Sequence, residues 1–149
     1  MNSNKTILLV EEDPIYVLLV KRAVYKADLS ASVQVVRDVE TAICYLRGQN
    51  HFADRERYPL PILIVTNIKL PRRPGLELLA WVRQQPKLKS LPVVVISSSG
   101  EVGESNKAKE LSASAYFVKP LPLNDFVHAL KNIMSHLATL EDWKTWSWR

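Results

Sequence analysis

Five short runs of apolar, mostly β-branched residues alternate with helical patterns, and this alternation limits the possible folds more than any other feature of the chain. The runs are Lys5–Val10, Ser32–Arg37, Pro61–Thr66, Leu91–Ser97 and the shorter Ala115–Val118. The first, third and fourth are almost continuously hydrophobic, which is typical of strands buried on both faces of a parallel sheet. Strands that alternate with helices, joined by right-handed connections, predict an α/β fold built on a doubly wound five-stranded parallel sheet.

Helical patterns fill the intervals between these runs. Asp13 followed by Pro14 is a capping residue with proline at the first helical position, and Asp38 can cap a second helix that stops at Gly48. The helices are expected at about residues 14–26, 39–48, 75–85 and 102–111, with a last one around Phe126, Leu130, Ile133 and Leu137, whose spacing is that of an amphipathic helix. The polar segment His51–Leu60 is expected to be an exposed loop.

Length and composition exclude several classes of protein. A chain of 149 residues with a single cysteine fits one domain without an internal disulfide or a zinc site that needs several thiolates. No apolar run has the length of a membrane span, and acidic residues follow the first apolar run too soon for a signal peptide, so a cytoplasmic protein is expected. The net charge of +5 permits an acidic partner. The basic residues are scattered, however, and no reader motif appears, so neither nucleic acid nor membrane is expected as a partner.

Polar residues follow the strands where each strand ends. Glu11 and Glu12 follow the first run, Asn67 the third and Lys119 the fifth, while Ser97 ends the fourth. Ligands of doubly wound sheets bind at the carboxyl ends of the strands. An acidic pair, an amide, a hydroxyl and a lysine are therefore expected to share one pocket.

Four motifs in this order resemble the receiver domains of two-component response regulators. They are ILLVEEDP at 7–14, NIKLPRRPG at 67–75, LPVVVISSS at 91–99 and AYFVKP at 115–120. The resemblance covers roughly residues 5–138 and implies the flavodoxin-like (βα)5 receiver fold and a role in histidine-kinase phosphorelay signalling rather than as an enzyme. The run 76–97 and the long loop before the third strand are most similar to the small single-domain regulators that partner cyanobacterial phytochrome-type histidine kinases.

The resemblance implies a metal site at the acidic pair. Glu11 and Glu12 occupy the positions that hold Mg²⁺, and the backbone carbonyl of Lys69 would be a further ligand. Oxygen donors suit this hard cation, which keeps several water ligands.

The resemblance also implies roles for four residues near the ends of the fourth and fifth strands. Ser97 would bind the phosphoryl group, and Lys119 would pair with the phosphoryl group or with the pocket carboxylates. Tyr116 stands at the aromatic switch position. The bond between Lys119 and Pro120 is implied to be cis.

One position departs from the family pattern. The phosphoacceptor of the family is an aspartate four residues before the proline that is Pro71 here, and that position holds Asn67. A carboxylate oxygen attacks phosphohistidine to form an acyl phosphate, whereas an amide oxygen is neutral, a poor nucleophile and a weaker Mg²⁺ ligand. The sequence therefore predicts an atypical receiver that binds partners without phosphorylation and holds Mg²⁺ weakly.

Other interpretations stay open at this point. The chain could be a conventional, phosphorylatable receiver in an engineered, phospho-dead Asp-to-Asn form. It could instead be a Mg²⁺-dependent phosphoryl-transfer hydrolase, although such enzymes need a nucleophilic aspartate after the first strand. Asp13 is more simply a helix cap than a ligand, and Arg72 and Arg73 form either a solvated loop or a kinase contact.

The chain is expected to divide into a receiver domain at 1–139 and a Trp-rich extension at 140–149. Trp143, Trp146 and Trp148 lie within six positions of each other. Exposed tryptophans often mark interfaces. They could help form a homodimer through the face of the fourth helix, fifth strand and fifth helix, or they could fold back on the last helix of their own chain.

Overall fold

A computed structural model describes residues 5–139 and contains one five-stranded sheet in which every strand pair is parallel. The strands lie in the order β2-β1-β3-β4-β5. Their bounds are β1 Thr6–Val10, β2 Ser32–Val36, β3 Leu63–Asn67, β4 Val93–Ser97 and β5 Ala115–Val118. The order reverses between β1 and β3, so the predicted doubly wound α/β fold is confirmed.

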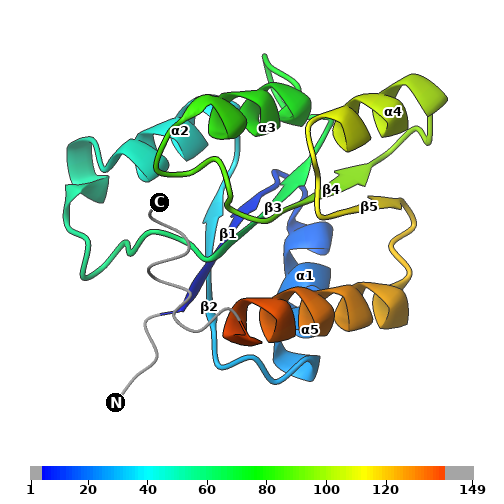
Figure 1. Cartoon of the computed structure of the whole chain (residues 1–149), viewed down its shortest axis with the longest axis horizontal. Coiled ribbons are helices and arrows are strands. Elements are labelled where there is room, and N and C mark those ends of the chain that lie inside the picture. Colours follow the sequence, from blue (N-terminus) through cyan, green and yellow to red (C-terminus); the bar gives the residue numbers. More distant parts are fainter. Residues whose placement is uncertain (1–4, 140–149) are drawn as a thin grey trace.

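Five α-helices cover the two faces of this sheet (Figure 1). They are α1 Pro14–Lys26, α2 Val39–Arg47, α3 Gly75–Gln84, α4 Val102–Glu110 and α5 Leu123–Thr139. Helices α2, α3 and α4 lie on one side of the sheet, and α1 and α5 lie together on the other. The side chains of Asp13 and Asp38 cap α1 and α2, and Gly48 ends α2 in the left-handed conformation, as predicted.

The hydrophobic core lies in two layers, one on each face of the sheet. Ile7 and Leu9 of β1 pack with α1 and α5, whereas Leu8 and Val10 pack with α2 and α3. Alternate residues of a strand point to opposite faces, so a strand covered on both sides must be apolar throughout. Among residues 5–139, no helix is both long and apolar enough to cross a bilayer.

The segment expected to be an exposed loop is exposed only in part, so that prediction was partly wrong. Asp54, Glu56 and Arg57 are exposed, but Phe52 is buried and Arg55 is half-buried. The segment contains a short 3₁₀ helix, η1, at Asn50–Ala53, whose Phe52 is buried against the core. Arg55 donates hydrogen bonds from Nη1 to the carbonyls of Tyr45 and Tyr58, and from Nη2 to that of Leu46. The guanidinium group of Arg55 thus satisfies backbone carbonyls at the end of α2 and in the loop itself.

Candidate functional site

The carboxyl ends of β1, β3, β4 and β5 lie at one edge of the sheet (Figure 1). The expected polar residues stand at these ends or directly after them. Backbone hydrogen bonds fix the segments that leave the strands. Ile68 N–H donates to the carbonyl of Ile96 at 2.8 Å, and Lys119 N–H donates to that of Ser97 at 2.8 Å. The residues that follow β3 and β5 are therefore held against β4.

Asn67 is the last residue of β3 and is almost completely buried. Its Nδ2 donates a hydrogen bond of 2.8 Å to the carbonyl oxygen of Lys69. Its Oδ1 is buried and has no hydrogen-bond partner. The NH₂ group of Asn67 therefore binds the Lys69 carbonyl oxygen, which the resemblance implies as a metal ligand. The side-chain oxygen of Asn67 is left without a hydrogen bond.

Gly75 allows the loop after Asn67 to close tightly. Its N–H donates to the carbonyl of Ile68 at 2.7 Å. A Cβ atom at position 75 would overlap the carbonyl oxygen of Asn67, so no residue with a side chain fits there without a shift of the backbone. The start of α3 thus packs directly on the backbone of the asparagine.

Glu11 and Lys119 form a buried ion pair. Lys119 Nζ lies 3.5 Å from Glu11 Oε1 and 3.9 Å from the centroid of the Tyr16 ring, a cation–π distance. Glu11 Oε2 accepts a hydrogen bond from the Asp13 N–H at 3.0 Å. Glu12 is exposed, so the two glutamates occupy different environments.

Ser97 contacts a carboxylate that the sequence did not single out. Its Oγ donates a hydrogen bond of 2.8 Å to Glu104 Oε1, and Ser99 Oγ donates to the same oxygen at 2.8 Å. Ser97 Oγ also accepts from the N–H groups of Ser99 and Gly100. The sequence feature that could have indicated this contact is Glu104, which lies in the first turn of α4, shortly after the serine-rich end of β4.

Two further predicted positions lie on β5 and just beyond it. The Oη atom of Tyr116 is buried and has no hydrogen-bond partner, and the Lys119–Pro120 peptide bond is cis. Asn67, Ser97 and Lys119 share the same edge, but each directs its polar atoms to other partners.

Arg72 links the loop after β3 to the start of α2. Its Nη2 lies 2.8 Å from Asp38 Oδ2 and 3.5 Å from Glu40 Oε1. Burial raises the pKa of Asp38, but the hydrogen bonds from Thr41 and Arg72 outweigh it, so the pKa lies below the usual value. Arg73 pairs with Glu77 on the surface of α3. The expected solvated basic loop therefore makes intramolecular ion pairs.

Most of the oxygen donors at this edge of the sheet already have partners within the chain. Of the carboxylates at this edge, Glu11 pairs with Lys119, Asp13 caps α1 and Glu104 binds serine hydroxyls. Within residues 5–139, no group of three or more His, Cys, Asp or Glu side chains could hold a metal ion. Only the exposed Glu12 and the unpaired Asn67 Oδ1 are without a competing partner among these donors.

Comparison with known proteins agrees with the sequence motifs. The family described as "Response regulator receiver domain" matches residues 7–131. The response regulator Rcp1 of Synechocystis sp. is 31% identical over 134 residues, which is 90% of this chain and 89% of the relative.

Solved structures of related regulators have the same fold. The bacteriophytochrome response regulator RtBRR is 35% identical with a TM-score of 0.75, covering 95% of this chain and 97% of the other. The phosphorylated cyanobacterial phytochrome response regulator RcpA is 29% identical with a TM-score of 0.76, covering 93% and 96%. A crystal structure of Rcp1 in its Mn²⁺-bound form is 31% identical with a TM-score of 0.73, covering 88% and 92%.

Proposed function

Because this chain belongs to the response regulator receiver family, we propose that it acts in histidine-kinase phosphorelay signalling by binding partners without being phosphorylated. The observation that carries this proposal is Asn67 at the end of β3, with its amide bonded to the Lys69 carbonyl. In this role the chain is a signalling protein of the cytoplasm and not an enzyme, as the sequence predicts.

The chemistry of position 67 supports the first part of the proposal. Phosphotransfer to a carboxylate forms an O–P bond and breaks the N–P bond of phosphohistidine. The neutral oxygen of Asn67 is a poor nucleophile and would have to form an unstable cationic product. The usual acceptor reaction is therefore absent at this residue.

The neighbouring contacts support a single, fixed conformation. Lys119 is held by Glu11 and Tyr16, and the hydroxyl of Ser97 is held by Glu104. Both groups would have to leave these partners to meet a phosphoryl group. We propose that Ser97, Tyr116 and Lys119 keep the positions of the family's phosphoryl-sensing residues while serving this fixed state.

The same contacts support weak Mg²⁺ binding. When bound, the ion would neutralise the charge of phosphoryl oxygens, and Glu11, Glu12 and the Lys69 carbonyl are the groups expected to hold it. In the described arrangement Glu11 is paired with a lysine, and the Lys69 carbonyl accepts an N–H of Asn67. We therefore expect Mg²⁺ titration by calorimetry to show tighter binding for Asn67→Asp than for the unaltered chain. Equal affinities would contradict the proposed weakening.

A histidine kinase, and specifically one of the phytochrome type, is the proposed partner. The relatives RcpA and RtBRR are named as phytochrome and bacteriophytochrome response regulators. Next to the site, α1 exposes Ile15 and Leu18, which are 65% and 68% accessible and lie one helical turn apart. We propose that this apolar pair packs against a helix of the kinase.

A homodimer through the face of α4, β5 and α5 is the second proposed association. Strand β5 is at the edge of the sheet. Val102 of α4 and Val118 of β5 are exposed on this side, with accessibilities of 73% and 40%. Exposed apolar groups of this kind support a contact between copies, which sedimentation of Val102→Lys against the unaltered chain would test.

The hydrolase alternative has little support in the geometry. The residues after β1 offer no free aspartate, because Asp13 caps α1 through a hydrogen bond from the Ile15 N–H. A Mg²⁺-dependent phosphatase assay on the purified chain is expected to show no turnover.

Phosphotransfer tests the main proposal directly. The chain and its Asn67→Asp variant are treated with acetyl phosphate and with the phosphorylated kinase, and each is analysed by intact-mass spectrometry. Only Asn67→Asp is expected to gain a phosphoryl group, while both proteins bind the kinase with similar affinity. Phosphorylation of the unaltered chain, or kinase binding that requires phosphorylated Asn67→Asp, would overturn the proposal.

Kinase binding by Leu18→Lys tests the docking face separately. The matched control is Gln84→Lys, which adds the same charge at an exposed position of α3, on the other side of the sheet from α1. Only Leu18→Lys is expected to bind the kinase more weakly. Equal losses for both variants would contradict a specific role of α1.

A further inference from the structure

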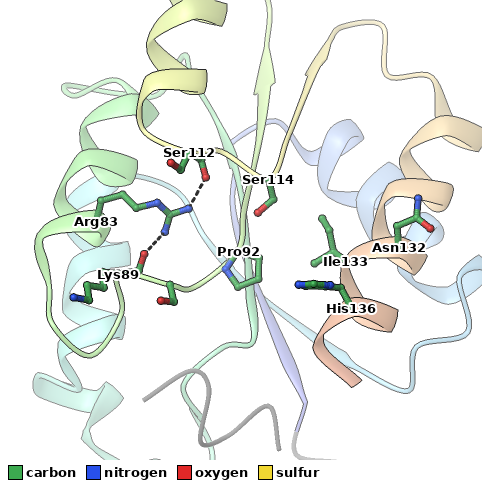
Figure 2. A pocket seen from close by; sticks show the side chains of 9 residues that line it. Arg83, Lys89, Pro92, Ser112, Ser114, Asn132, Ile133 and His136 are labelled. Atoms are coloured by element: carbon green, nitrogen blue, oxygen red, sulfur yellow. Dashed lines mark hydrogen bonds between the residues drawn. The ribbon is translucent and has the colours of Figure 1, made fainter. Parts of the chain in front are cut away.

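A second pocket lies at the amino ends of β4 and β5, at the opposite edge of the sheet from the site described above. Its volume is about 510 Å³. Figure 2 shows Pro92, Ser114 and Ile133 around it, with Arg83 and Lys89 on one side and α5 on the other. The pocket thus has apolar walls formed by the start of β4 and by α5, and a basic rim.

The positive charge on the rim has no carboxylate partner in the described part of the chain. Arg83 donates hydrogen bonds to four neutral carbonyl oxygens, those of Leu111, Lys89, Leu91 and Ser112. Among residues 5–139 no carboxylate forms an ion pair with Arg83 or Lys89. A partly buried guanidinium without a counter-charge favours an acidic group nearby.

The segment that follows α5 has the composition to fill this pocket. Helix α5 ends at Thr139, and Ile133 and His136 of its last turns line the pocket. The next residues of the sequence are Leu140, Glu141, Asp142 and Trp143, followed by Trp146 and Trp148. An extended chain spans about 3.3 Å per residue, so Trp143 lies within about 13 Å of the end of α5.

We propose that the segment 140–149, which lies outside the described residues, docks in this pocket of its own chain. In this arrangement the indole of Trp143 packs on Pro92 and Ile133, and the carboxylates of Glu141 and Asp142 face Arg83 and Lys89. Docking removes the Trp143 indole from water and supplies the missing counter-charge. It also assigns the tail to its own domain rather than to a dimer contact, and it does not depend on the residue at position 67.

Nuclear Overhauser effects between the Trp143 indole and the Ile133 methyl groups test the contact in the full chain. Cross-peaks within one chain are expected. A sample that mixes two differently labelled chains identifies contacts between copies, and cross-peaks seen only there would overturn the proposal in favour of an exchanged tail. The absence of any cross-peak from Trp143 to the pocket would also overturn it.

A charge reversal at the rim tests the electrostatic part. A Trp81→Phe background leaves the tail tryptophans as the only indole fluorophores. In this background Lys89→Glu should shift the docking equilibrium by about fivefold toward the free tail, as for the loss of an exposed ion pair. Tail emission should move to longer wavelength and acrylamide quenching should increase.

A matched control and a rescue complete this experiment. Lys131→Glu makes the same change at an exposed lysine of α5 that does not line the pocket, and it should leave the emission unchanged. Adding either Glu141→Lys or Asp142→Lys to Lys89→Glu leaves one carboxylate for Arg83, and at least one of these two variants should restore protection. Equal effects of the two lysine reversals, or no rescue, would contradict the proposed charge pairing.

Discussion

Replacing Lys119 by methionine tests whether this lysine is needed to hold the strand-end site together. The substitution keeps most of the apolar side chain but removes the ammonium group that lies 3.5 Å from Glu11 Oε1. Glu11 is only 2% exposed, so it would be left as an unpaired charge beneath the loop that follows β1. We expect a clear loss of stability.

The geometry limits the size of this loss. At 3.5 Å the attraction between the two charges is about 5 kcal/mol with an effective dielectric constant of about 20. Removing one partner of a buried pair typically costs about 3–5 kcal/mol. The Asp13 N–H still donates to Glu11 Oε2 after the substitution, and Lys119 is 15% exposed. The lower end of the range applies, about 3 kcal/mol, which lowers the Tm by about 6–12 °C.

Urea denaturation followed by circular dichroism measures this loss as a change in midpoint with an unchanged slope. Lys69→Met is the matched control, because Lys69 is exposed nearby and should cost less than about 0.5 kcal/mol. The double variant Glu11→Gln/Lys119→Met should be more stable than the sum of the single effects predicts, by about 2 kcal/mol. Strict additivity, or a loss below about 1 kcal/mol for Lys119→Met, would refute the argument for a buried pair.

Three further substitutions test other contacts. Gly75→Ala should prevent stable folding or lower the free energy of unfolding by more than about 4 kcal/mol, because its Cβ would meet the carbonyl of Asn67, and a denaturation midpoint within error of the parent would contradict this. Burial raises the pKa of Tyr45 to about 12. The fold favours the neutral phenol, so Tyr45 contributes about 3 kcal/mol of stability below pH 10, and this contribution is lost as the pH rises from 10 to 12. Tyr45→Phe should therefore make the free energy of unfolding less dependent on pH between 10 and 12. Asp38→Ala removes the cap that accepts from Thr41 N–H and should cost about 1–2 kcal/mol at pH 7. Since the pKa of Asp38 is lowered, its contribution is present above pH 3.8 and lost on acidification, so a cost that does not shrink toward pH 3 would contradict the reasoning.

The sequence predicted the fold because burial on both faces leaves a distinct pattern. Ile7 and Leu9 face one helical layer and Leu8 and Val10 face the other, so β1 reads as a continuous apolar run. The same reasoning placed Glu11, Asn67, Ser97 and Lys119 at one edge of the sheet, because parallel strands end on the same side. These parts of the prediction depend only on periodicity and topology.

The partners of these side chains could not be predicted in the same way. The bond from Ser97 to Glu104 depends on where the first turn of α4 lies, and the contact of Lys119 with Tyr16 depends on how α1 packs. The burial of Arg55 could not be predicted for a related reason. A guanidinium that satisfies three carbonyls has the same sequence signature as one that faces solvent.

Arg83 has a consequence for how the chain could be reconnected. Its four hydrogen bonds join the segment before β4, through Lys89 and Leu91, to the turn before β5, through Leu111 and Ser112. A circular permutation that opened the chain at either connection would leave carbonyls and a guanidinium without partners.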